Sequence, residues 1–257
     1  MSRLQIMDTT IRDGQQSLWA TRMSIGDMLP ILPKMDRVGY WAIEAWGGAT
    51  FDSCMRFLDE NPWDRLRSIN AATPNTPLSM LTRGQNLVGY KHYSREIVNR
   101  FIKASKRNGV HVFRVFDALN DIRNVVDTAE AVNECGGHFE GAISYTISPV
   151  HTLDSYLEYA QQLKELGADS ICVKDMAGLM TPYRAERIVK ALTPRSACPC
   201  ICTATMSAAW PRQLPQGGRG GRIHRRHRIR SAGLRQFPAC RRDDRGGAAG
   251  KPLRHRP

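Results

Sequence analysis

The chain lacks any long apolar run, and it lacks an N-terminal basic stretch followed by apolar residues. A membrane-spanning helix needs about 18 consecutive apolar residues, and a secretory signal needs the basic stretch before the apolar one. The chain also lacks the paired, regularly spaced cysteines of a disulfide scaffold, since its 7 cysteines are odd in number and scattered. These absences predict a cytoplasmic protein with reduced thiols.

Most of the chain has no excess of positive or negative residues, although the full sequence has a formal net charge of +13. From Arg195 onward there are 15 Lys and Arg against 2 Asp and Glu, so residues 1–194 are neutral with 22 of each sign. The segment 195–257 is rich in Arg, Gly, Pro, Ala and His, and such a composition buries too little apolar surface to offset the entropy of ordering. We therefore predict a folded domain over residues 1–194 and an irregular, basic, disordered tail over residues 195–257.

Short apolar runs alternate with longer segments of helical period in residues 1–194, which is typical of βα units around a parallel sheet. The length of 257 residues suits one (β/α)₈ barrel, of which the pattern supplies about six units. The predicted strands are Leu4–Met7, Ala42–Ala45, Leu78–Leu81, Val112–Phe116, Gly141–Tyr145 and Ser170–Val173. The predicted helices are Ser24–Val38, Phe51–Glu60, Glu96–Asn108, Val125–Glu134, Leu153–Leu166 and Tyr183–Leu192.

Charged, polar or glycine residues follow each predicted strand, and in a barrel these strand ends meet at one face, where active sites form. The first cluster, DTTIRDGQQS, contains Asp13, which suits a divalent cation, and Gln16, which suits a substrate carbonyl or carboxylate. The alternative is that Asp13 and Arg12 pair with other residues of the barrel. After the second strand, Gly47 and Gly48 permit a close approach of the backbone.

The third cluster, LTRGQNLVGY, places Arg83 where a rigid guanidinium can grip a carboxylate, with Tyr90 a short distance on. Lys174 follows directly after the sixth apolar run, so its side chain is expected in the mouth of the barrel. A buried lysine loses its charge readily, and the neutral amine can act as a base or form a carbamate that ligates a metal. The alternative is an ion pair between Lys174 and Asp13, Asp117 or Asp175.

Five motifs carry a family resemblance: DTTIRDGQQS, EAWGGATFD, RGQNLVGY, FRVFDALND and VKDMAGL. In order and spacing they resemble the biotin-dependent carboxyltransferase domain of pyruvate carboxylase, the oxaloacetate decarboxylase α subunit and transcarboxylase. The similarity covers roughly residues 2–194, and ISYTISPVHT looks closest to the decarboxylase and transcarboxylase branch. It implies a TIM barrel that exchanges carbon dioxide between carboxybiotin and pyruvate or, in reverse, decarboxylates oxaloacetate.

The resemblance also implies roles for individual residues and partners. Asp13 and a carbamylated Lys174 would ligate a divalent metal such as Zn, Mn or Co, and Gln16, Arg83 and Tyr90 would contact the keto acid. Lys174, Arg83 and Gln16 are therefore the expected catalytic residues. Biotin would arrive on a carrier domain or another subunit, and a homo-oligomer and a membrane partner subunit of the decarboxylase type are further expectations.

The family's remaining metal ligands form a His-x-His pair at the end of the seventh strand, where this chain has ICTATMSAAW. We hypothesise a shifted reading frame near Arg195, because charge and pattern change abruptly there. If Ile201–Met206 were encoded ATC TGC ACT GCC ACT ATG, reading from the third base would give Leu-His-Cys-His-Tyr. The nucleotide sequence tests this, and early stop codons in the alternative frames would count against it. Six strands with half a metal site predict an unstable or inactive chain, which measurable oxaloacetate decarboxylation would overturn.

Two other functions stay open at this point. The motif DTTIRDG also begins aldol- and Claisen-type acyl-CoA lyases and synthases on the same barrel, although RGQNLVGY and VKDMAGL fit them less well. The basic tail is the other candidate, because segments rich in Lys and Arg bind nucleic-acid phosphates, without sequence specificity and with steep salt dependence. An exchange assay with pyruvate and biotin, an acyl-CoA cleavage assay, and DNA retention after deletion of residues 195–257 separate these functions.

Overall fold

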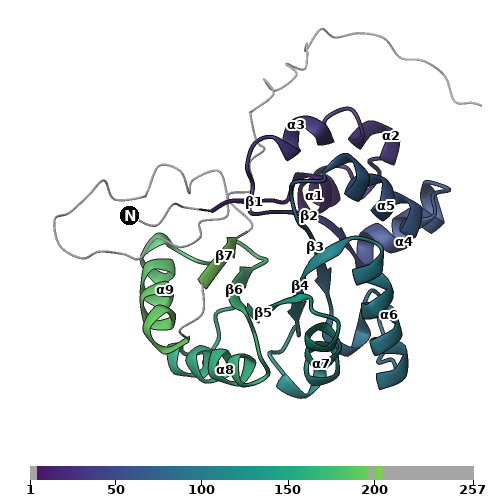
Figure 1. The fold of residues 1–257 in the computed structure, drawn as a ribbon. Helices are drawn as coiled ribbons and strands as arrows, with labels where there is room; N and C mark the ends of the chain where they lie inside the picture. The colour runs from purple at the N-terminus through teal and green to yellow at the C-terminus, as the bar shows by residue number, and fades with distance from the viewer. Residues whose placement is uncertain (1–4, 197–199, 205–257) are drawn as a thin grey trace, which may run out of the picture.

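The computed structural model describes residues 5–196 and 200–204, which form one curled parallel sheet with helices outside it (Figure 1). The seven strands lie side by side in chain order, as right-handed βα units produce. Within the described residues the sheet stays open between its first and last strands. The strands are β1 (Met7–Asp8), β2 (Ala42–Gly47), β3 (Leu78–Thr82), β4 (Val110–Phe116), β5 (His138–Ser144), β6 (Ser170–Asp175) and β7 (Cys200–Ala204).

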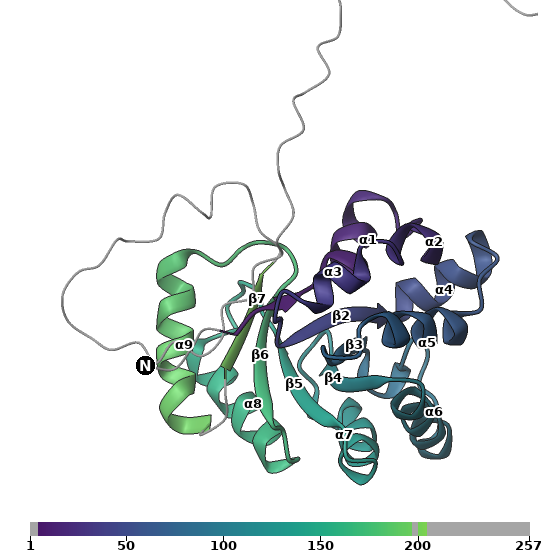
Figure 2. The same cartoon turned by 45° about the horizontal axis from the view of Figure 1, so that its top comes forward.

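Helices cover the outer face of the sheet, with α6 to α9 alternating with the later strands (Figure 2). None of the helices in the described part has both the length and the hydropathy needed to cross a bilayer. The helices are α1 (Gln15–Leu18), α2 (Ile25–Met28), α3 (Leu32–Asp36), α4 (Gly48–Phe57), α5 (Pro62–Ala72), α6 (Arg95–Arg107), α7 (Val126–Glu134), α8 (Leu153–Glu165) and α9 (Pro182–Ser196).

The predicted incomplete TIM barrel is confirmed, and the structure adds a seventh strand that composition did not reveal. Strand β7 pairs in parallel with β6, from Ile171 opposite Cys200 to Asp175 opposite Ala204. It lies inside the segment predicted to be irregular. The five residues CICTA tolerate an extended backbone, and the free edge of β6 supplies their hydrogen-bond partners. The rest of the predicted tail lies outside the described residues, and the shifted reading frame stays a prediction.

One predicted helix is divided in the structure, and one longer helix was missed besides the four-residue α1. The segment predicted as one helix over residues 24–38 forms α2 and α3, because Pro30 and Pro33 remove backbone donors and restrict the residues before them. The missed helix is α5, which follows closely after α4. Its start is marked by Asn61, whose side chain accepts a hydrogen bond from the Trp63 N–H at 2.9 Å, and by Pro62 in the first turn.

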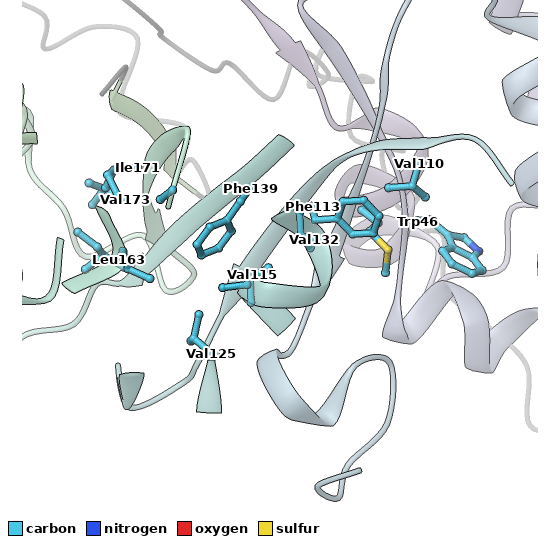
Figure 3. Packing of buried hydrophobic residues seen from close by; sticks show 14 of the residues in the cluster. Trp46, Val110, Phe113, Val115, Val125, Val132, Phe139, Leu163, Ile171 and Val173 are labelled. Atoms are coloured by element: carbon cyan, nitrogen blue, oxygen red, sulfur yellow. The ribbon is translucent and has the colours of Figure 1, made fainter. Parts of the chain in front are cut away.

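The main core lies between the sheet and the helices (Figure 3). Alternate residues of β4 and β5, such as Phe113 and Phe139, point outward and meet Val132 of α7 and Leu163 of α8, all fully buried. Full burial of each such side chain contributes about 1.5–3 kcal/mol. The other residues of these strands face the inside of the curled sheet, which also holds buried charged side chains such as Glu44, Arg114 and Glu140.

Candidate functional site

A pocket of about 330 Å³ opens among the loops that follow the strands. Its lining comes from the segment after β1, from the ends of β2, β3, β4 and β6, and from the residues that directly follow β2, β3 and β6. Four of the five predicted site residues line it together: Asp13, Gln16, Arg83 and Lys174. Asp13 and Lys174 are therefore on the same side of the molecule, as the carboxyltransferase assignment requires.

The segment after β1 is shaped by Asp8, which is buried at the end of the strand. Its carboxylate accepts hydrogen bonds from the Thr10 N–H at 2.9 Å and the Thr10 hydroxyl at 3.1 Å. Burial raises the pKa of Asp8, and these hydrogen bonds oppose the rise. The chain then forms the π-helical turn Thr10–Gly14 and continues into α1. This tight path brings Asp13 and Gln16 to the pocket although β1 has only two residues.

Arg12 organises one wall of the pocket. One terminal nitrogen, Nη2, lies 2.7 Å from Oε1 of the fully buried Glu44. The other, Nη1, lies 3.2 Å from the Asp13 carboxylate and donates to Oε1 of Gln16 at 3.3 Å. Of the alternative pairings with other barrel residues, Arg12 makes one with Glu44, whereas Asp13 pairs with Arg12 itself. Because the amide oxygen of Gln16 faces Arg12, its NH₂ group remains as the donor to a ligand.

Arg83 is held in place by backbone. Its Nη1 donates to the Gly89 carbonyl at 3.0 Å, and a Cβ added to Gly48 would lie 3.0 Å from the Arg83 Cζ. The close backbone approach predicted for the paired glycines is thus confirmed at Gly48. Tyr90 lies over Arg83, with its ring centroid 4.7 Å from the Cζ atom. Tyr90 is 78% exposed and is not part of the pocket lining, so it contacts Arg83 from outside.

Lys174 is buried at the base of the pocket, with Nζ 5.6 Å from the centroid of the Phe116 ring. Burial first, and then the charge of Arg12, lowers the pKa of Lys174, while Glu44 opposes this. Within residues 5–196 no carboxylate lies within ion-pair distance of Lys174. The alternative ion pairs are therefore absent there. Asp175 instead accepts the N–H groups of Leu179 and Met180.

Beneath the pocket lies a buried charge network that the sequence reasoning missed. Arg114 of β4 binds Glu140, its cross-strand neighbour in β5, and reaches Glu44 of β2 at 3.1 Å. All three side chains are 1% exposed or less. Burial lowers the pKa of Arg114, but the charges of Glu140 and Glu44 outweigh burial and raise it. A signal was available, because each of these charged residues stands between apolar or small residues within a strand.

The predicted metal site is not completed by the described residues. No group of three His, Cys, Asp or Glu side chains in residues 5–196 is placed to hold a cation. Asp13 is the one acidic residue in the pocket lining, and Lys174 would need a covalent change to become an oxygen ligand. A structural or catalytic zinc site uses three or four protein ligands. The described donor set therefore does not fit a divalent cation.

Comparison with known proteins decides the family, because the HMGL-like family model matches residues 3–205. The chain belongs to the HMGL-like family. Over 196 residues this HMGL-like chain is 55% identical to a pyruvate carboxylase subunit of Methanocaldococcus jannaschii, covering 76% of the chain and 35% of that protein. It is 53% identical over 187 residues to the methylmalonyl-CoA carboxyltransferase 5S subunit of Propionibacterium freudenreichii, covering 73% of the chain and 37% of that protein.

Solved structures agree with these relatives. The carboxyl transferase domain from Rhizobium etli pyruvate carboxylase with pyruvate matches with a TM-score of 0.76 and 40% identity, covering 79% of this HMGL-like chain and 36% of that one. The same domain with 3-bromopyruvate also matches at 0.76, with 41% identity and coverage of 78% and 35%. The resemblance to the carboxyltransferase domain is confirmed. The chain spans about a third of the length of the relatives it matches.

Proposed function

We propose that this chain carries the keto-acid half of a biotin-dependent carboxyl-transfer site, with pyruvate or oxaloacetate as its ligand. One observation carries the proposal: Gln16, Arg83 and Lys174 come from three separate strand ends and line one small pocket. These side chains supply a guanidinium, an amide donor and an ammonium, which together suit a carboxylate next to a carbonyl. The relatives named as pyruvate carboxylases, and the related domain solved with pyruvate, support the choice of ligand.

Each residue has a separate task in this proposal. Arg83 binds the carboxylate, because its position is set by the Gly89 carbonyl and its Nη2 and Nε groups make no hydrogen bond within the described residues. The NH₂ group of Gln16 donates to a ligand oxygen, since Arg12 holds the other side of the amide. Lys174 faces the charge that develops when the methyl carbon of pyruvate is activated. Tyr90 stacks on Arg83 and limits its movement.

The groups that complete carboxyl transfer come from elsewhere. Biotin on a carrier domain or another subunit would deliver the carboxyl group to this pocket. The family resemblance implies a divalent cation such as Zn, Mn or Co, with Asp13 and Lys174 as ligands, and a bound cation supplies a Lewis acid. Because the described donor set does not fit a cation, the tasks given above do not depend on one, and we expect low turnover by this chain alone. A homo-oligomer and a membrane decarboxylase partner are further proposals.

Ligand binding tests the proposed function. Pyruvate, oxamate and an acyl-CoA are offered in turn to the purified chain, and saturation-transfer NMR reports binding. We expect pyruvate and oxamate to bind and Arg83→Met to weaken the binding of both. The matched control, Arg107→Met, removes an exposed arginine at the end of α6 and should leave binding unchanged. Binding of the acyl-CoA without pyruvate would favour the lyase or synthase alternative instead.

A further inference from the structure

We infer that this pocket binds its keto acid without a divalent cation, because Arg83 and Lys174 supply the positive charge themselves. The inference rests on the proposed function and concerns how the ligand is held. It departs from the metal dependence that the family resemblance implies. The reason lies in the partners of Asp13 and in the charge of the pocket lining.

Asp13 is already committed to a cationic partner. Its Oδ1 lies 3.2 Å from Nη1 of Arg12, and Arg12 is itself fixed at 2.7 Å from the buried Glu44. Arg12 is only 5% exposed in its side chain, so it has little freedom to turn away. A cation bound to Asp13 would therefore sit next to a buried guanidinium. Repulsion between the two charges, which burial strengthens, weakens such a site.

The lining as a whole favours an anion. It contains three cationic side chains, Arg12, Arg83 and Lys174, and one carboxylate, Asp13. Glu44 lies outside this lining, and its carboxylate neutralises the charge of Arg12. The pocket therefore keeps a net positive charge, which attracts a keto acid and repels a divalent cation. A concave site of one sign raises the local concentration of the opposite ion.

The two cations that remain are placed to act on a ligand. Arg83 uses Nη1 for the carbonyls of Gly89 and Val88, so its other edge stays available. Lys174 has no ion pair within residues 5–196, and it lines the same pocket of about 330 Å³. That volume suits a keto acid of a few heavy atoms. Because both cations line one pocket, a carboxylate held by Arg83 leaves the rest of the ligand inside the pocket that Lys174 also lines.

The test compares affinity with and without metal. The full chain is dialysed against EDTA, and the dissociation constant of pyruvate, and of its isostere oxamate, is measured by titration calorimetry before and after Mn²⁺ is added. We expect the two constants to agree within about twofold, and water-proton relaxation to show no stoichiometric Mn²⁺. Removal of dissolved carbon dioxide should also leave the affinity unchanged, because Lys174 acts as a cation and not as a carbamate.

Two variants separate the role of Lys174 from a structural one. In EDTA, Lys174→Met should weaken pyruvate binding about tenfold or more, since a charge-assisted hydrogen bond is lost. Lys174→Arg keeps a cation and should restore most of the affinity. The control Arg107→Met should bind as the parent does, and circular dichroism melts confirm that each variant is folded.

The outcomes distinguish this inference from the proposed function. Binding that appears only with Mn²⁺, or that survives Lys174→Met unchanged in EDTA, overturns the inference and leaves the keto-acid assignment in place. If neither pyruvate nor oxamate binds with or without metal, the proposed function falls together with the inference. Equal binding in EDTA and Mn²⁺, lost in Lys174→Met, supports both.

Discussion

Two cationic side chains inside the curled sheet have opposite surroundings. Arg114 lies between Glu44 and Glu140, whereas Lys174 lines the pocket without an ion-pair partner in residues 5–196. Both are buried, and both lie on strands that are two apart in the sheet. Removing one partner of a buried ion pair destabilises the fold, while an unpaired charge that faces a pocket is available to a ligand. The comparison separates structural charges from functional ones.

The largest expected effect is a loss of stability when Arg114 is removed. Arg114→Ala leaves Glu44 and Glu140 as buried carboxylates without their shared partner, so the free energy of unfolding should fall by about 3–5 kcal/mol. Urea denaturation measures the change. Arg67→Ala is the control, because its ion pair with Asp64 is exposed and should contribute less than about 1 kcal/mol. Equal losses in the two variants would show that the network is not structural.

The functional side should respond in the opposite way. Arg83→Met should weaken pyruvate binding by about ten- to a hundredfold, because a charged hydrogen-bond donor is worth about 1.5–3 kcal/mol. Its stability should change little, since the Arg83 guanidinium bonds only to loop carbonyls in the described residues. Calorimetric titration and urea denaturation are run on the same sample. A large loss of stability with unchanged affinity would place Arg83 with the structural charges.

Acid tests Glu44, which pairs with Arg114 and also with Arg12 of the pocket lining. Burial raises the pKa of Glu44, but Arg12 and Arg114 outweigh it, so the pKa lies below its ordinary 4.5. The stability that this group contributes is therefore present above pH 4.5 and is lost as the pH falls through its folded pKa. Glu44→Gln should reduce the slope of stability against pH in that window by up to about 1.4 kcal/mol per pH unit. Denaturation across a pH series gives the slope, and an unaltered slope contradicts the assignment.

A methyl group at Gly48 tests how firmly the pocket holds Arg83. In Gly48→Ala the new Cβ would lie 2.8 Å from the Val88 carbonyl and 3.0 Å from Arg83, so the guanidinium must shift. We expect pyruvate affinity to fall about tenfold, as for the loss of one aligned charged hydrogen bond. Gly26→Ala is the control, because its Cβ would meet only the Ser24 hydroxyl at 3.6 Å. Similar affinities in both variants would mean that the loop yields freely.

The smallest effect concerns Tyr90. Its exposed ring stacks on Arg83 outside the pocket, and an exposed cation–π contact contributes about 0.5–1 kcal/mol. Tyr90→Ala should therefore weaken pyruvate binding by about two- to fivefold, whereas Tyr90→Phe should not. Competition titration against oxamate resolves this difference. A hydroxyl-dependent loss in Tyr90→Phe would instead show that Tyr90 contacts the ligand directly.

Local sequence patterns predicted the strands better than they predicted the helices and the buried charges. The apolar runs located β2 to β6, whereas the first strand is Met7–Asp8 and not Leu4–Met7 as predicted. The clusters after the runs named four residues that line the pocket. The same patterns missed α5, although Asn61 and Pro62 mark its start, and they missed β7 because the surrounding composition is basic. They also missed the network of Glu44 and Arg114, because the partners of these charges lie on other strands and cannot be read from the neighbouring sequence.

The sequence alone determined the βα order, the family and the kinds of side chain at each strand end. These depend on periodicity and on short motifs, which can be recognised without knowing the contacts between distant parts of the chain. Only the tertiary structure decided which charges meet. Asp13 pairs with Arg12, Arg114 joins Glu44 to Glu140, and Lys174 is left facing the pocket. The register of the curled sheet determines which side chains of different strands form ion pairs, and that register is set only when the strands pack together.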